Sequence, residues 1–521
     1  MNTNRAIILA FVINLIYLCI SGQAVAYQRS NLQPQNSYGI DTVSLSRLYY
    51  KPSDYLWIDQ QQLKLEAYDA LEFIAHSVNH GLNANDYHYD LLQHLDPMLS
   101  ESEAHLFDLM LTDGLLKLIS DISTGKLDPT IADPKWSIPR IQFDATAFLQ
   151  QALSENHFKD SLVSLIPNSV QYRQLKAAAE RYQNYVDQGG WSVITDMPEL
   201  RLGDTDPGIS DVRHRLAFED KILDIGGAEQ TDYFDTRLEQ AVKRFQRHHS
   251  LQADGVIGPA TIRAMNISAA ERLQQIDINL ERLRWLPADL GERYIMVNLA
   301  NYRLTAIEDD EVKLDMRVIV GKTKRSTPSF SSKMTHVVLN PRWYIPNKLA
   351  RIDLLPKQQR NANYFDRYNI RVFSTESGKK TEVDPDTIDW QSVSRQAFPY
   401  TLVQDPGRKN ALGRLKFILP NPWRIYLHDT PSKSLFNRSK RMFSSGCIRV
   451  EDPFALADFS LRGNNTHQPL LDSIEDDKSY STKLDQPLSV YAIYRTVWSS
   501  NGEIIFSPDS YHRDQRMAQY L

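Results

Sequence analysis

Apolar residues recur at intervals of three and four through the first part of this chain. Residues 63–75 and 106–122 each place their apolar side chains on one side of a helix. The spacing predicts a helical N-terminal region, which we place at residues 27–200. It shows no catalytic constellation, and the alternation of Asp86, His88 and Asp90 is more typical of a surface loop or strand than of a metal site.

A turn-rich segment, residues 203–208, precedes a second and smaller unit. Leu238, Val242 and Phe245 share one helix face, and a turn followed by a capped helix is expected over residues 254–265. The pair Phe245-Gln246 and the pattern Asp254-Gly255-x-x-Gly258-Pro259-x-Thr261 resemble the small three-helix peptidoglycan-binding domains. The predicted range of this domain is 201–268.

Beyond a helical stretch at residues 269–285, the pattern changes to alternating and β-branched runs separated by turn signals. The segment 348–400 interrupts them with polar, helix-favouring sequence, and we expect it to form a capping insertion. The chain is therefore predicted to be an α+β multidomain protein whose last domain, residues 269–521, is β-rich. The expected strands cover residues 293–304, 312–320, 414–419, 424–427, 488–498 and 503–506. A turn is expected at Asp309-Asp310, before the second strand, and a hairpin turn at Asn501-Gly502, between the last two.

The N-terminus is typical of an export signal, with Arg5 before the apolar run 6–20 and then Ala24-Val25-Ala26. We expect cleavage after Ala26 and a periplasmic protein; retention as an inner-membrane anchor is the alternative. The net charge of −5 over 521 residues argues against a nucleic-acid-binding protein, which would present a basic face.

Removal of the signal would also remove Cys19 and leave Cys447 as the single thiol of an exported chain. His428 ends a strand-like run that Pro431 terminates, so a loop could bring Cys447 within its reach. Gly446 allows a tight turn whose backbone N–H groups could bind an oxyanion. Arg449 lies two positions beyond Cys447, on the same side of an extended strand, where it could lower the thiol pKa or bind a carboxylate. A cysteine-nucleophile enzyme is the favoured hypothesis.

The run Tyr426-Leu-His428-Asp-Thr-Pro431, followed by Ser444-Ser-Gly-Cys-Ile-Arg-Val450, resembles the active-site signature of the YkuD-type L,D-transpeptidases. Residues 339–346 and 404–417 also match this family, and the domain order resembles its long YcbB-like branch. Most of the family has histidine before Gly-Cys, whereas this chain has Ser445.

The resemblance implies Cys447 as nucleophile and His428 as general base, with Gly446 and Cys447 N–H groups and the Tyr426 hydroxyl around the oxyanion. It implies that Arg449 orients the motif or engages a carboxylate. The residues expected to contact substrate are Trp343, Ser445 and Asn410.

The implied activity is 3–3 cross-linking of peptidoglycan tetrapeptide stems through a cysteine thioester, which would make the enzyme a carbapenem target. No metal or other cofactor is expected, and the expected partners are peptidoglycan stems and glycan, together with cell-wall synthesis proteins. Two alternatives stay open: an L,D-carboxypeptidase of the same fold, and a non-catalytic wall-binding scaffold. A penicillin-binding serine enzyme and a zinc amidase are disfavoured, since the chain has no Lys-Thr-Gly triplet and no His-Glu-x-x-His motif.

Overall fold

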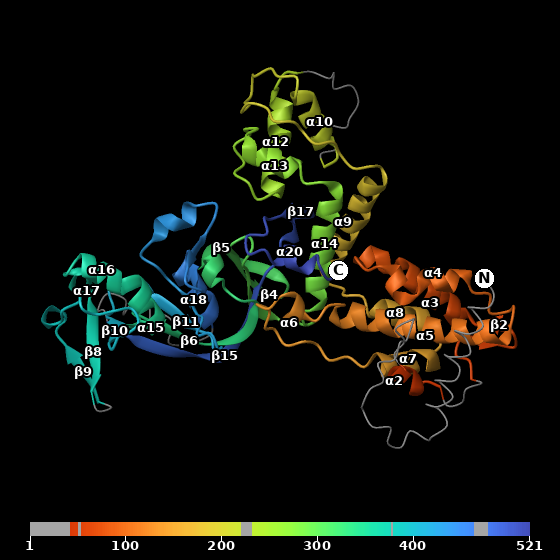
Figure 1. The fold of residues 1–521 in the computed structure, drawn as a ribbon, viewed down its shortest axis with the longest axis horizontal. Coiled ribbons are helices and arrows are strands. Elements are labelled where there is room, and N and C mark those ends of the chain that lie inside the picture. The colour runs from red at the N-terminus through yellow and green to blue at the C-terminus, as the bar shows by residue number, and fades with distance from the viewer. Residues whose placement is uncertain (1–41, 50–53, 220–231, 377–378, 463–477) are drawn as a thin grey trace.

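The computed structural model describes residues 42–49, 54–219, 232–376, 379–462 and 478–521. The predicted export signal lies outside these residues. Three parts extend from a common centre (Figure 1): a helical part, a smaller helical part, and a β-rich part that ends in a separate lobe. Within the described ranges, no helix is both long and apolar enough to span a membrane.

The N-terminal part is a helical bundle built around α5 (Glu101–Thr124), which is buried along most of its length. The Ser100 hydroxyl caps this helix by accepting a hydrogen bond from the Glu103 N–H. The predicted helix 63–75 corresponds to α3 (Leu65–Ala75), and the predicted 106–122 lies inside α5, so both periodic patterns are confirmed. The other elements of the N-terminal part are α2 (Thr42–Ser46), β1 (Ile58–Asp59), β2 (Gln62–Leu63), η1 (His76–His80), η2 (Ala84–Tyr87), α4 (Tyr89–His94), α6 (Pro129–Ala132), α7 (Ala145–Ser154), α8 (Phe158–Ser164) and α9 (Val170–Asp187). The buried residues of α6 and α9 pack with the helix at 269–284 and not with the core around α5.

The second part contains α10 (Ile209–Ala217), α12 (Thr236–His248) and α13 (Pro259–Met265) around one apolar core. Its motif residues serve structural purposes. The buried Gln246 amide donates hydrogen bonds to Asp254 Oδ1 and to the Val256 carbonyl, at 3.0 and 2.9 Å. Gln246 Oε1 accepts from the N–H of Gly255, which has a φ of +78°. The motif thus stabilises the turn that leads into α13.

Helix α14 (Ala269–Arg284) lies where the three parts meet (Figure 1), and it opens with a capping box between Ser268 and Glu271. Ile276 and Leu280 pack with residues of α9, β16 (Val497–Ser500) and β17 (Glu503–Phe506) in one hydrophobic cluster. The predicted catalytic range begins with this helix, which packs against both the helical bundle and the β-rich part.

The β-rich part is a closed barrel in the strand order β5-β14-β12-β11-β6-β15-β3-β4, with β4 pairing back to β5 and β13 added beside β5. Most neighbours are antiparallel, but β12 pairs in parallel with β14, β15 with β3, and β13 with β5. Helix α18 (Pro453–Leu461) packs against the barrel core. The strands are β3 (Arg293–Asn298), β4 (Arg303–Glu308), β5 (Glu311–Gly321), β6 (Phe330–Leu339), β11 (Leu415–Ile418), β12 (Leu427–His428), β13 (Met442–Ser444), β14 (Ile448–Val450) and β15 (Tyr480–Ile493).

Three of the predicted strand ranges differ from the structure. The segment 293–304 forms β3 and the beginning of β4, and 488–498 contains the end of β15 and the beginning of β16. The predicted strand 424–427 shortens to β12, because Arg424 adopts a left-handed φ of +56° that no extended strand accommodates. The turn at Asp309-Asp310 and the hairpin at Asn501-Gly502 are confirmed, and all four residues have positive φ.

The predicted insertion forms a lobe with its own hydrophobic core and a sheet in the order β7-β10-β8-β9. Its sheet extends beyond the predicted range 348–400, since β7 (Trp343–Tyr344) precedes that range and β10 (Thr401–Gln404) follows it. The lobe is only partly helical. Its strands were not predicted, because polar strands such as β9 lack the apolar alternation that would identify them in the sequence. Its remaining elements are α15 (Asn347–Leu349), η4 (Ala350–Leu354), α16 (Leu355–Arg360), α17 (Tyr364–Arg367), β8 (Ile370–Glu376), β9 (Lys379–Val383) and η5 (Pro385–Thr387).

Candidate active site

Three adjacent barrel strands bring the chemically reactive side chains together. Lys416 of β11 lies directly opposite His428 of β12, and His428 lies opposite Arg449 of β14. Paired residues on neighbouring strands project from the same face of the sheet. Leu427 and Ile448 point into the barrel core, so this row of three lies on the outer face.

Cys447 immediately precedes β14 and lies beside Tyr426, which immediately precedes β12. The Ile448 N–H donates to the Tyr426 carbonyl at 3.1 Å and fixes the two segments side by side. The half-buried thiol accepts hydrogen bonds from the backbone N–H and the hydroxyl of Tyr426, and its own S–H donates to the Arg424 carbonyl, 4.0 Å from Sγ. Burial raises the thiol pKa; the Tyr426 donors and the charges of Lys416 and Arg449 only partly oppose it. Cys447 is therefore a neutral thiol at pH 7.

His428 is buried, and its Nδ1 lies 2.5 Å from the carbonyl oxygen of Asp429. Burial, reinforced by Arg449 and Lys416, lowers the pKa of His428 to about 3, so the imidazole is neutral at pH 7. A neutral imidazole that donates through Nδ1 leaves Nε2 unprotonated, and Nε2 is then the basic atom. The Asp429 carbonyl thus fixes the tautomer that a general base requires.

We expected the base and the thiol to come within reach, and the structure places them on one face. The rings of Tyr426 and His428 contact each other with centroids 5.5 Å apart, and Tyr426 contacts the thiol. Between the described side chains of Cys447 and His428 there is no direct hydrogen bond; the imidazole instead contacts the backbone of Asp429 and Leu412. Such bonds often form only when substrate is bound.

Lys416 is a residue of this site that the sequence reasoning missed. Its Nζ lies 4.0 Å from the centre of the Tyr426 ring, a cation–π contact. Burial lowers the pKa of Lys416, while a charged Cys447 would raise it. A signal for it existed: Lys416 belongs to the segment 404–417 that matches the family, and it alternates with the apolar Leu415 and Phe417.

Trp343 lies at the edge of the site. Its side chain donates a hydrogen bond to the Tyr426 hydroxyl, so the insertion lobe touches the thiol's own partner. The neighbouring Tyr344 is exposed. This arrangement is consistent with a wall beside the thiol.

The loop before Cys447 is held by an internal network. Gly446 has a φ of +123°, in the region that favours glycine, and its N–H donates to Ser444 Oγ at 3.1 Å. The Ser444 hydroxyl donates to the Cys447 carbonyl, and the Thr327 hydroxyl donates to the Gly446 carbonyl. The N–H of Gly446 is thus already engaged, whereas that of Cys447 has no hydrogen-bond partner in the described part of the chain.

The two remaining predicted residues occupy different environments. Ser445 is exposed, and its hydroxyl accepts a hydrogen bond from Arg325, which also pairs with Asp353 of the insertion lobe. Asn410 is buried, and its amide donates to the carbonyls of Pro341 and Asp405 at 3.0 and 2.9 Å. These bonds favour a role for Asn410 in positioning the loop, since its amide faces backbone and not an open groove.

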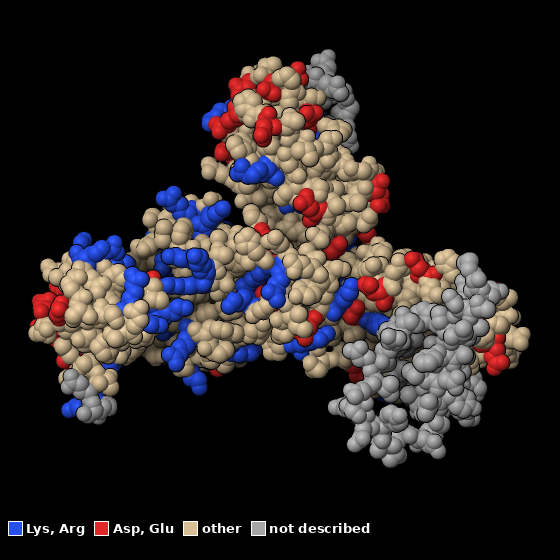
Figure 2. Space-filling model, viewed as in Figure 1, with Lys and Arg blue, Asp and Glu red and all other residues tan. Residues whose placement is uncertain are grey.

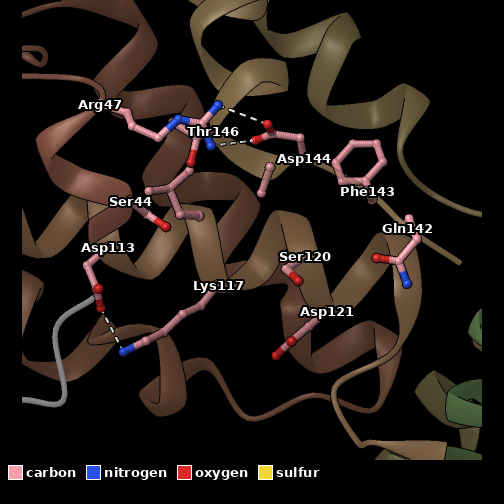
Figure 3. Close-up of a pocket in the computed structure, with 12 residues that line it drawn as sticks. Ser44, Arg47, Asp113, Lys117, Ser120, Asp121, Gln142, Phe143, Asp144 and Thr146 are labelled. Atoms are coloured by element: carbon pink, nitrogen blue, oxygen red, sulfur yellow. Dashed lines mark hydrogen bonds and ion pairs between the residues drawn. The ribbon is translucent and has the colours of Figure 1, made fainter. Parts of the chain in front are cut away.

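A cavity of about 750 Å³ lies in the helical bundle, lined by residues of α2, α5 and α7 (Figure 3). Its charges are largely paired: Arg47 with Asp144, and Lys117 with Asp113. It contains no thiol and no grouping that could activate a nucleophile.

Family models match three parts of the chain. A "Scaffold domain" covers residues 44–178, a "Putative peptidoglycan binding domain" covers 205–265, and an "L,D-transpeptidase catalytic domain" of the YkuD type covers 292–468.

A protein of Haemophilus influenzae named "Putative L,D-transpeptidase" is 38% identical over 247 residues, which is 47% of this chain and 49% of that protein. The chain thus spans about half the length of this curated relative.

Solved L,D-transpeptidases show weaker likeness. One from Stackebrandtia nassauensis is 13% identical with a TM-score of 0.22, covering 58% of this chain and 97% of its own. Another from Xylanimonas cellulosilytica is 14% identical with a TM-score of 0.17, covering 57% and 99%. At such TM-scores the assignment depends on the family models and the relative. Residues 292–468 thus match the L,D-transpeptidase catalytic domain, and residues 205–265 match a putative peptidoglycan-binding domain.

Proposed function

We propose that the protein is a cysteine-nucleophile L,D-transpeptidase that forms 3–3 cross-links between peptidoglycan tetrapeptide stems in the periplasm. The observation that carries the proposal is the arrangement of the thiol and its neighbours. The Cys447 thiol accepts hydrogen bonds from two donors of Tyr426. On the same face, the Asp429 carbonyl holds His428 as a neutral imidazole.

In the first half-reaction, Cys447 Sγ attacks the carbonyl carbon between the third and fourth residues of the donor stem. His428 Nε2 accepts the thiol proton and passes it to the departing amine of the terminal D-alanine. The C–N bond breaks, and a thioester to Cys447 remains. The oxyanion is stabilised by the unengaged N–H of Cys447 and by the Tyr426 hydroxyl, because the Gly446 N–H is engaged with Ser444.

In the second half-reaction, the side-chain amine of a diamino acid from another stem attacks the thioester. His428 removes one proton from this amine and returns it to the sulfur. The new amide is the cross-link, and the thiol is regenerated. If water replaces the amine, the same steps give an L,D-carboxypeptidase.

The peptidoglycan-binding domain would hold the enzyme on its polymeric substrate while the barrel performs both steps. Figure 2 shows lysine and arginine gathered over the barrel and the insertion lobe on the face in view. This charge is suited to stems that end in carboxylates.

The decisive experiment incubates purified enzyme with tetrapeptide muropeptides and identifies the products by mass spectrometry. Wild type should yield cross-linked dimers, and Cys447→Ala should yield none while still binding isolated wall material. Dimers formed by Cys447→Ala would overturn the proposal, and released D-alanine without dimers would favour the carboxypeptidase.

Covalent capture provides an independent test. A carbapenem should add to wild type and produce a mass shift located on the peptide that contains Cys447. Cys447→Ala should show no shift, and a shift on another residue would reassign the nucleophile.

A further inference from the structure

Lys416 and Arg449 flank His428 from the two neighbouring strands, one on each side, in a single cross-strand row. Both side chains are half-buried, and burial lowers the pKa of each. Cations removed from water are costly unless an anion accompanies them.

Among the residues that the structure describes, neither cation has a carboxylate partner. Lys416 Nζ lies over the face of the Tyr426 ring. Arg449 forms no side-chain hydrogen bond, and its Nε is buried without a partner. By contrast, two other arginines of the barrel have partners in the protein. Arg317 binds the carboxylate of Glu451, and Arg441 donates to backbone carbonyls.

We propose that Lys416 and Arg449 together bind the terminal carboxylate of the donor stem, the carboxylate of the D-alanine that leaves. This inference rests on the proposed function and names the substrate group that the site recognises. It assigns to Lys416 a role in substrate specificity.

The dimensions of the substrate fit this assignment. The leaving carboxylate carbon is three bonds from the scissile carbonyl carbon, about 3 to 4 Å away. The attacking sulfur would lie about 3 Å from that carbonyl. The carboxylate therefore falls within about 7 Å of Sγ, close to the spacing of about 6.6 Å between alternate residues of a strand such as Cys447 and Arg449. A carboxylate at the end of the diamino acid side chain would be several bonds more distant.

The pair would also disfavour stems with a fifth residue. A fifth residue would place an amide where the two cations require an anion, and the cations would remain buried without a partner.

The test compares acyl-enzyme formation from a tetrapeptide with a free terminal carboxylate and from the same peptide amidated there. Wild type should prefer the free acid by at least about tenfold in kcat/KM, the discrimination typical of a charge-assisted hydrogen bond. Lys416→Met should raise KM for the free acid and bring the ratio close to 1, and Lys416→Arg should restore the preference. Lys333→Met, which removes a cation from β6 of the same barrel, should leave the ratio unchanged.

A third peptide, amidated only on a carboxylate of the diamino acid, identifies the carboxylate that is bound. The assignment would be overturned if acyl-enzyme formation were slower with this third peptide but not with the peptide amidated on D-alanine. Equal rates with free and amidated D-alanine in wild type would also overturn it, and would leave the transpeptidase proposal intact.

A further arm is independent of peptidoglycan chemistry. The ratio of Cys447 alkylation by iodoacetate to that by iodoacetamide should be higher in wild type than in Lys416→Met, because the cations attract the carboxylate reagent. The same ratio in both proteins would count against the pair even if no stem peptide were ever turned over.

Discussion

The thiol of Cys447 depends on its immediate neighbours for its reactivity. Tyr426→Phe removes the hydroxyl that donates to Sγ and should raise the thiol pKa further. A hydrogen bond to a charged group is worth about 1.5–3 kcal/mol, or roughly one to two pKa units. The pH dependence of iodoacetamide alkylation at Cys447 measures this pKa. Tyr344→Phe, which alters an exposed tyrosine of β7, should leave it unchanged, and an unaltered pKa in Tyr426→Phe would show that the hydroxyl does not stabilise the thiolate.

The neutral state of His428 gives a second prediction at the scale of one residue. An ordinary histidine base gains a proton below about pH 6.5 and loses activity. Here the pKa is lowered to about 3, so His428 stays unprotonated as the pH falls through 6.5. The value of kcat/KM for acyl-enzyme formation, which reports the free enzyme, should therefore be flat between pH 8 and pH 5. An acid limb with an apparent pKa between 6 and 7 would contradict the assignment.

Among the elements, the insertion lobe is joined through Arg325 to the loop that precedes Cys447. Arg325 pairs with Asp353 of η4 at 2.6 Å and donates to Ser445 Oγ at 2.9 Å. Because a partly exposed ion pair is typically worth only about 0–1 kcal/mol, its loss should not unfold the protein. We expect Arg325→Met to lower the acylation rate severalfold at unchanged melting temperature, as the loop loses its orientation.

A double-mutant cycle of Arg325→Met with Asp353→Asn measures whether the lobe and the loop are coupled. Arg303→Met, which breaks the exposed pair with Asp315 on β4 and β5, is the matched control and should not change the rate. Additive effects of the two substitutions would show that the lobe acts independently of the loop.

At the scale of the element, local sequence predicts some features of this structure and not others. The helices α3 and α5, the β16–β17 hairpin and the fold class follow from local periodicity and turn residues. The shortening of β12 and the engagement of the Gly446 N–H do not, because they depend on Arg424 backbone geometry and on the Ser444 hydroxyl. Lys416 lies in a segment that resembles the family, but its place beside His428 follows only from the pairing of β11 with β12.

At the scale of the whole molecule, the three parts are held together by buried side chains at their junction. Phe506 of β17 is 2% exposed and stacks on His249 of the peptidoglycan-binding domain, with centroids 5.3 Å apart. It also contacts the ring of Tyr182 on α9 and lies beneath the guanidinium of Arg272 on α14. A single side chain therefore connects all three parts.

Phe506→Ala should loosen this junction, because truncation of a buried phenylalanine typically costs about 3–5 kcal/mol. We expect faster hydrogen exchange and proteolysis around residues 191–208 and at Ile267 and Ser268, the segments that join the peptidoglycan-binding domain to the rest. Acylation by soluble tetrapeptide should persist, while cross-linking of intact wall should fall, since the barrel and its anchor would no longer be held in a fixed relation. Phe459→Ala, which truncates an equally buried phenylalanine of the barrel core, should lower stability without exposing those segments. Equal exposure of the segments in both variants would mean that the domains are held by overall stability and not by Phe506.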